Sequence, residues 1–341
     1  RGLGDVYKRQ AYAYISIVEV LLKLGSVIMI QYCFADKLLA FGALNMGVTI
    51  LTALTYRFYC VRNFLNCRYV RYWSALLFKE LFSYIGWSLI GNLAWTFNSQ
   101  GMNILINMFF GPVFNATRGI ASSVESAVSS FLYNFITPAV PPIIKAYAAG
   151  DIDEMIRLSL RSSKLGFLLF MCLSLPLISV MNPILKLWLI APPPQSWTFC
   201  LLSLIYIQCN SLGGTLQNMV QATGKVKRYQ LSNGIVKIMA LPIVYIIYKC
   251  GGDVVAYLWT LILTSIVGLM VQLDAVRRLI DSFKISDYLK KVIMPALTAY
   301  LLPFLLSFYF SCMEMESLKM METVAIMVVI CLFSVWFIGF T

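Results

Sequence analysis

Amide and hydroxyl side chains recur at helical spacing along an otherwise apolar segment near residues 84–108. Successive members are four, three, four and four residues apart, so they share one face of a helix. An unpaired amide in hydrocarbon costs about 1 to 3 kcal/mol or more, so this face needs hydrogen-bond partners. The stripe consists of Asn92, Thr96, Ser99, Asn103 and Asn107.

Two further stripes follow the same rule, and one of them is charged. Arg118 and Glu125 share one helix face at a separation of about 10 Å. The stripe near 117–140 contains Arg118, Ser122, Glu125, Ser129 and Tyr133. The stripe near 198–221 contains Gln208, Ser211, Thr215, Asn218 and Gln221.

Polar stripes on membrane helices have two interpretations. A single amide is most simply a hydrogen bond between packed helices. Continuous polarity on several helices instead favours a water-filled cavity. Ionisable groups within or at the ends of apolar segments support the cavity, namely Glu19, Lys23, Arg118, Glu125 and Lys237. Glu19 and Lys23 are spaced i, i+4 and either neutralise each other or take part in ion coupling, whereas Glu125 and Arg118 are the main functional candidates.

The elements that position these stripes are predicted to be transmembrane helices. Of 341 residues, 60% are hydrophobic and 12% charged, which excludes a water-exposed globular surface. A helical span needs about 20 apolar residues, and runs of this length favour helices over barrel strands. The sequence predicts an all-α, polytopic transmembrane bundle with spans near 12–32, 38–58, 84–108, 117–140, 163–185, 198–221, 230–249, 254–273, 292–310 and 323–341.

The inventory of side chains excludes several chemistries. The chain has no histidine, and its nine cysteines form no CxxC pair, so we expect neither a metal site, a catalytic triad nor a disulfide framework. Residues 221–230 are not a nucleotide-binding loop, because Met219 stands where the first glycine belongs and Val226 follows Lys225. We therefore expect no cofactor, no catalytic residues and no enzymatic activity.

The net charge of +12 follows membrane topology rather than a nucleic-acid partner. Alternate loops carry seventeen Lys and Arg, and the other loops carry five. Because basic loops face the cytoplasm, the segment before Ala11 is also expected inside. A surface helix is expected at 151–164, capped by Asp151, whose Arg157, Arg161 and Lys164 would meet lipid headgroups.

Three segments resemble a known family: GWSLIGNLAWTFNSQGMNILINMFFGPVFNATRGIA, FITPAVPPIIKAYAAGD and LQNMVQATGKVKRYQ. They are similar to the polysaccharide transporter branch of the multidrug/oligosaccharidyl-lipid/polysaccharide exporter superfamily, particularly O-antigen and lipopolysaccharide flippases of Bacteroidetes. The resemblance runs from about Ala11 to the C-terminus.

The resemblance implies two six-helix lobes around a central cavity and alternating access. On this reading, residues 11–58 are the last two helices of the N-terminal lobe and 59–83 a basic linker. Residues 84–273 are then the complete second lobe, 274–291 a basic cytoplasmic loop and 292–341 an accessory helix pair. The polar segment 1–10 resembles translated sequencing adaptor, and both ends look truncated.

The implied substrate is an oligosaccharide on an undecaprenyl diphosphate carrier, moved across the bacterial inner membrane for surface polysaccharide biosynthesis. Amides and hydroxyls would bind sugar hydroxyls, Arg118 or Lys237 the diphosphate, and Trp95 a sugar face. The expected cavity residues are Asn92, Trp95, Asn103, Asn107, Arg118, Glu125, Gln208, Asn218 and Lys237. Membrane lipids and polysaccharide assembly proteins are the expected partners, and Arg157, Arg161 and Lys164 have a weaker second role in gathering the diphosphate headgroup.

Three alternatives remain open. A cation-coupled drug antiporter of the same superfamily would use Glu125 as its cation site. A membrane glycosyltransferase or polymerase would normally need an acidic pair or a large external loop, and the longest external loop, 182–197, has no carboxylate. The third alternative is an inactive fragment of such a transporter.

Overall fold

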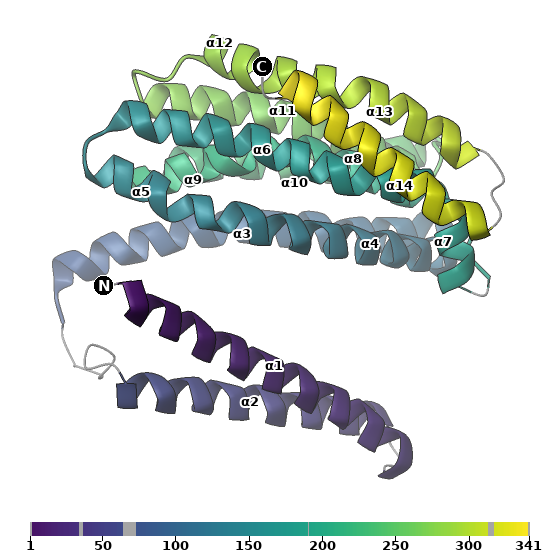
Figure 1. Cartoon of the computed structure of the whole chain (residues 1–341), viewed down its shortest axis with the longest axis horizontal. Coiled ribbons are helices and arrows are strands. Elements are labelled where there is room, and N and C mark those ends of the chain that lie inside the picture. Colours follow the sequence, from purple (N-terminus) through teal and green to yellow (C-terminus); the bar gives the residue numbers. More distant parts are fainter. Residues whose placement is uncertain (1, 34–36, 64–72, 190, 313–316, 340–341) are drawn as a thin grey trace. The chain divides into compact units, whose positions relative to one another are not determined.

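The chain folds into helices throughout the part that the structure describes. The computed structural model describes residues 2–33, 37–63, 73–189, 191–312 and 317–339 (Figure 1). Every regular element there is helical, which confirms the predicted all-α class. The contacts divide the chain into two compact units, Arg1–Ala75 and Leu76–Thr341, and this boundary falls inside the expected linker 59–83.

The first unit is a pair of packed helices, α1 (Gly2–Cys33) and α2 (Lys37–Asn63). The rings of Tyr12 and Tyr56 stack with their centroids 5.7 Å apart, and the Tyr56 hydroxyl lies 3.1 Å from that of Ser16. These contacts join the two helices near one end. Helix α1 begins at Gly2, so residues 2–10 continue it.

One charged pair in the first unit had two interpretations. The Glu19 carboxylate lies 2.6 Å from the Lys23 ammonium, one turn further along α1. The two charges therefore neutralise each other, which is the first of the two interpretations given above.

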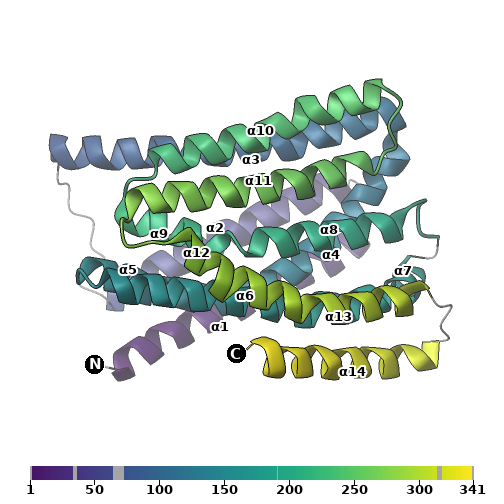
Figure 2. The ribbon, with the colours of Figure 1, turned by 90° about the horizontal axis from the view of Figure 1, so that it is seen from above.

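The second unit is a helix bundle whose elements are α3 (Ala75–Phe110), α4 (Pro112–Ile136), the 3-10 turn η2 (Thr137–Ala139), α5 (Val140–Ala148), α6 (Ile152–Ser179), α7 (Met181–Trp188), α8 (Ser196–Ser211), α9 (Gly214–Thr223), α10 (Lys227–Lys249), α11 (Ala256–Leu279), α12 (Ile285–Tyr288), the π-helical turn η3 (Leu289–Ile293), α13 (Met294–Cys312), α14 (Ser317–Ser334) and the π-helical turn η4 (Val335–Gly339). Figure 2 shows α10, α11, α8 and α6 in that order across the unit, and each packs on the next. The expected accessory pair, α13 and α14, packs against α6.

The core of this unit lies around α6 and α8–α9, which are the most deeply buried of the long helices. Small buried residues on α6 allow its neighbours to approach closely. They include Ser163, Gly166 and Ser174. A β-carbon at Gly166 would lie 2.7 Å from Cδ1 of Ile136 on α4.

Helices α3 and α10 also meet through small residues. A β-carbon at Gly101 would lie 2.6 Å from Cδ2 of Leu241, and one at Gly234 would lie 3.4 Å from the β-carbon of Ala94. A side chain at position 101 would therefore require Leu241 to move. The two small residues allow α3 and α10 to approach closely.

Several predicted boundaries differ from the structure. The expected surface helix 151–164 is the first part of the continuous helix α6, although Asp151 caps it as predicted, accepting a 3.0 Å hydrogen bond from the Glu154 amide. The expected span 163–185 ends at Val180, where the backbone leaves the helical region before α7. The expected span 198–221 is interrupted at Leu212–Gly213. At that break the Tyr288 hydroxyl donates to the Leu212 carbonyl at 2.6 Å, which supplies a partner for a freed backbone group.

Nine helices in the described residues are long and apolar enough to cross a membrane, so the chain is a multi-pass membrane protein. The sequence predicted ten. The missing one lies in α3, which is 36 residues long but does not qualify as apolar. Its amides lower its apolar character, so composition alone does not mark it as a span.

Candidate functional site

The polar stripes of α3 and α4 meet at Arg118. Its Nη1 donates to Oδ1 of Asn103, and its Nη2 donates to the Ser99 carbonyl at 3.0 Å. The guanidinium carbon also lies 5.7 Å from the ring centroid of Tyr257 on α11, within the range of a cation–π contact. One cation therefore joins two predicted stripes and is held against a third helix.

The local sequence explains this meeting. Gly111 takes φ +83°, which a glycine adopts without strain, and Pro112 follows at the start of α4. The chain reverses there, so residues at similar distances from Gly111 face each other. Asn103 lies eight residues before the turn and Arg118 seven after it, equal to about 12 Å and 10.5 Å of helix rise.

Much of the joined surface, which we call the α3–α4 polar face, is accessible in the second unit. Asn103 and Arg118 at its centre are half-buried, and Asn103 donates to Oε1 of Gln100 at 3.1 Å. The exposed members are Asn92, Thr96, Asn107, Ser122 and Tyr133. These amides and hydroxyls are available to bind a ligand or water.

Glu125 belongs to the same face and is half-buried there. Its carboxylate interacts electrostatically with Arg118. Among the described residues, however, no ion pair or side-chain hydrogen bond to this carboxylate is present. Glu125 is thus a carboxyl group on a membrane helix without a hydrogen-bond or ion-pair partner in this part of the chain.

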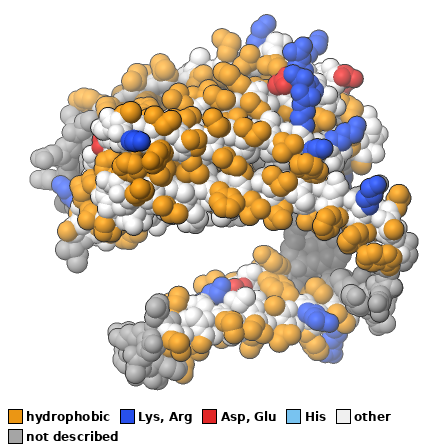
Figure 3. Space-filling model, turned by 180° about the vertical axis from the view of Figure 1, so that it is seen from behind, with side chains coloured by type: hydrophobic (Ala, Val, Ile, Leu, Met, Phe, Trp, Pro, Cys, Tyr) orange, Lys and Arg blue, Asp and Glu red, His pale blue; other side chains and the backbone are white. Residues whose placement is uncertain are grey.

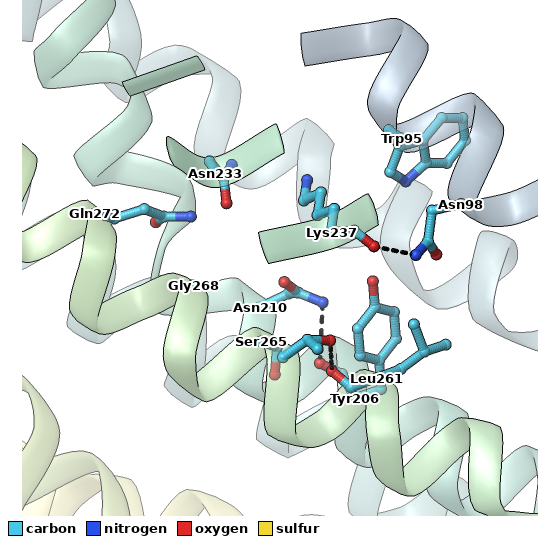
Figure 4. Close-up of a pocket in the computed structure, with 11 residues that line it drawn as sticks. Trp95, Asn98, Tyr206, Asn210, Asn233, Lys237, Leu261, Ser265, Gly268 and Gln272 are labelled. Carbon is cyan, nitrogen blue, oxygen red and sulfur yellow. Dashed lines mark hydrogen bonds between the residues drawn. The ribbon is translucent and has the colours of Figure 1, made fainter. Parts of the chain in front are cut away.

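A small polar cavity lies between α3, α8, α10 and α11 (Figure 4). Its volume of about 20 Å³ is enough for one water molecule. Asn98 Nδ2 donates to the Lys237 carbonyl and ties α3 to α10 at its edge. The polar residues that line the cavity are Trp95, Asn98, Tyr206, Asn210, Asn233, Lys237, Thr264, Ser265 and Gln272.

Two polar groups at this cavity lack partners within the described residues. No hydrogen bond or ion pair to the Lys237 ammonium is present there, and Oε1 of Gln272 is buried without a hydrogen bond. A bound water or ion would satisfy such groups. The cavity brings together two predicted residues, Trp95 and Lys237.

Sequence reasoning missed Asn210, Asn233 and Gln272 as members of this cavity. Asn233 and Lys237 are spaced i, i+4, which could have placed them on one helix face. That signal cannot show that α8 and α11 contribute to the same space.

Gln208 lies in a dry contact between helices, not in a cavity. Its Nε2 donates to the Phe167 carbonyl at 3.0 Å, and its Oε1 accepts from Ser174 Oγ at 3.4 Å. Thr215 on the same predicted stripe shares a hydrogen bond with Ser163. Gln208 and Thr215 therefore face α6, and helix packing accounts for the polarity of these two members of the stripe.

Asn218 lies apart from the α3–α4 polar face. Thr117, the neighbour of Arg118, donates to the Pro194 carbonyl at 3.3 Å and so sets the start of α4 level with the start of α8. Asn218 belongs to α9, which lies at the end of the unit opposite the start of α8 (Figure 2) and packs against α5, α6 and α11. The expectation that Asn103, Glu125 and Asn218 share one chamber is not met within the second unit.

The expected headgroup contacts, Arg157, Arg161 and Lys164, lie on the first half of α6 and line a separate groove. In the described part of the chain, no group of three or more His, Cys, Asp and Glu side chains could hold a metal ion. Comparison with known protein families, curated proteins and solved structures finds no match.

Proposed function

We propose that this membrane protein is a flippase-type transporter that moves a lipid-linked oligosaccharide across the bacterial inner membrane for surface polysaccharide biosynthesis. The observation that carries the proposal is the α3–α4 polar face, where Arg118 joins two stripes of amides and hydroxyls. A purely packing role would leave these groups covered, yet Asn92, Asn107 and Ser122 are exposed in the second unit.

The chemistry of this face suits a sugar attached to a phosphate. Amides and hydroxyls donate to and accept from sugar hydroxyls. Arg118 has five N–H donors, and the bonds to Asn103 and Ser99 use two of them. The remaining donors can hold a phosphate oxygen, while the exposed ring of Trp95 offers a surface for stacking on a sugar. The prenyl chain of the carrier would stay in the lipid.

The family resemblance of residues 86–121, 135–151 and 216–230 supports the same proposal. It adds alternating access between two lobes, a cytoplasmic side for the basic loops, and interaction with polysaccharide assembly proteins. Transport would expose the α3–α4 polar face alternately to the two sides of the membrane.

The proposal is tested by reconstituting the chain in proteoliposomes with a fluorescent lipid-linked oligosaccharide and measuring its transfer between leaflets. Arg118→Ala and Glu125→Ala should each abolish transfer at unchanged protein level. Ser123→Ala is the matched control on α4, because Ser123 is exposed and bonds only to its own helix at Gly119. Transfer that both Ala variants leave unaltered would remove the two residues from the mechanism.

A cation-coupled antiporter is the second candidate. The absence of an ion partner for Glu125 among the described residues favours it, because such a carboxylate can bind an organic cation or a coupling ion. This function predicts cation efflux that depends on the Glu125 carboxylate and does not require a cation at position 118. Efflux lost in Glu125→Gln but kept in Arg118→Ala would favour the antiporter over the flippase.

A further inference from the structure

A groove of about 900 Å³ lies on the second unit between the first half of α6 and the segment η3–α13. Arg157, Arg161 and Lys164 line it from α6, and Lys290 and Lys291 line it from η3. Figure 3 shows Lys and Arg side chains gathered at one end of the unit beside largely hydrophobic surface. The fold thus adds two cations, distant in sequence, to the three that the spacing on α6 predicted.

Not all of these cations are free. Arg157 forms an ion pair with Glu154, and Lys291 lies 3.1 Å from the Asp287 carboxylate. For Arg161, Lys164 and Lys290, no carboxylate of the described residues is within ion-pairing distance. Asp153 is the other acidic residue on the groove, and it forms no ion pair in this part of the chain. Three cations on the two walls and one carboxylate, Asp153, are therefore without an ion partner in this part of the chain, which leaves the groove with an excess of positive charge.

The groove also has an apolar component. Leu160, Leu165 and Leu168 of α6 line it with Pro295 of α13. Leu165 is 49% exposed and so offers apolar surface beside the cations. Cations at the mouth and hydrocarbon along the helices match the two parts of a membrane lipid.

We propose that this groove binds a membrane phospholipid that carries two phosphates, of which cardiolipin is the type. One phosphate meets Arg161 and Lys164 on α6, and the second meets Lys290 on η3, because the glycerol bridge separates the two groups. The acyl chains lie along α6 and α13. The inference does not depend on the transport function proposed above.

The position of the groove separates this ligand from the transported lipid. The groove is formed by α6, η3 and α13, and none of these helices contributes the α3–α4 polar face. We therefore assign the groove to a structural phospholipid and not to the transported lipid.

The test measures lipid binding to the purified full chain in detergent by native mass spectrometry. The probes are cardiolipin, phosphatidylglycerol, phosphatidylcholine, polyprenyl diphosphate and inorganic diphosphate. Cardiolipin should bind about tenfold or more tightly than phosphatidylglycerol, and the triple variant Arg161→Gln/Lys164→Gln/Lys290→Gln should lose at least about tenfold of that affinity. The charge-keeping variant Arg161→Lys/Lys164→Arg/Lys290→Arg should stay within about twofold of the native chain.

A matched control removes the same charge elsewhere, as Lys225→Gln/Arg228→Gln/Lys249→Gln, and should bind cardiolipin like the native chain. Circular dichroism of each variant separates lost binding from lost folding. The proposal is overturned if the first triple variant binds cardiolipin normally or if the control loses as much affinity. Tighter binding of polyprenyl diphosphate or inorganic diphosphate than of cardiolipin would also overturn it.

Discussion

Arg118 of α4 donates a hydrogen bond to the side chain of Asn103 on α3, across the reversal of the chain at Gly111. The contact makes one polar face from two helices. The geometry of the guanidinium is essential to it, since a second nitrogen of the same group reaches the Ser99 carbonyl.

Arg118→Lys should therefore impair leaflet transfer, although it keeps the positive charge. A lysine ammonium lacks the planar fork that binds Asn103 and Ser99 together. We expect leaflet transfer to fall about tenfold or more and the free energy of unfolding to drop by about 1 to 3 kcal/mol. Transfer assays and thermal unfolding in detergent measure the two effects. Native transfer in Arg118→Lys would show that charge alone suffices.

The close approach of α3 and α10 predicts a rescue experiment. Gly101→Val should destabilise the chain by about 1 to 3 kcal/mol, because its side chain meets Leu241. Leu241→Ala in the same chain should recover part of this loss. Gly234→Ala is the matched control, since its β-carbon would only touch Ala94 at 3.4 Å. An additive loss in the double variant would refute the contact.

Gln208 tests whether a buried amide serves packing alone. Gln208→Ala leaves the buried Ser174 hydroxyl without this partner and removes the second hydrogen bond to the Phe167 carbonyl, at a cost of about 1 to 3 kcal/mol in unfolding free energy. Transfer per folded molecule should stay unchanged, which thermal unfolding and transfer assays on the same sample can separate. A loss of transfer without a loss of stability would indicate that Gln208 contacts the substrate.

Removing the charge of Lys237 should stabilise the chain and reduce leaflet transfer. Its ammonium has no partner among the described residues, and an unpaired charge within a span is unfavourable. Lys237→Met should raise the free energy of unfolding by about 1 kcal/mol or more while reducing transfer. Lys237→Arg, which keeps the charge, is the control. A destabilised Lys237→Met would reveal a partner for the ammonium.

The sequence predicts the helical class, most spans and the cap at Asp151 because these depend on local patterns. It does not predict the break at Leu212–Gly213, which is supported by the hydroxyl of Tyr288, far along the chain. The local sign of the break is the pair Gly213–Gly214, and it does not show that a distant tyrosine supports the break.

The candidate site was predictable only in part, for a similar reason. Spacing along one helix identified the stripes on α3 and α4, but it could not say which stripe meets another helix. Gln208 forms its hydrogen bonds with α6. Asn210, Asn233 and Gln272 belong to three different helices and line one cavity. Such groupings arise from tertiary packing, which a single-helix pattern does not contain.

The central claim is that the α3–α4 polar face is a wet path for the substrate. Thr96→Cys and Asn107→Cys place thiols on this face, and Met108→Cys places one at an exposed apolar position on a different side of the same helix. In a background whose native cysteines are replaced by alanine, a charged thiol reagent applied to membranes should label the first two, and lipid-linked oligosaccharide should slow that labelling. Equal labelling of all three positions, or no labelling of Thr96→Cys and Asn107→Cys, would contradict the account.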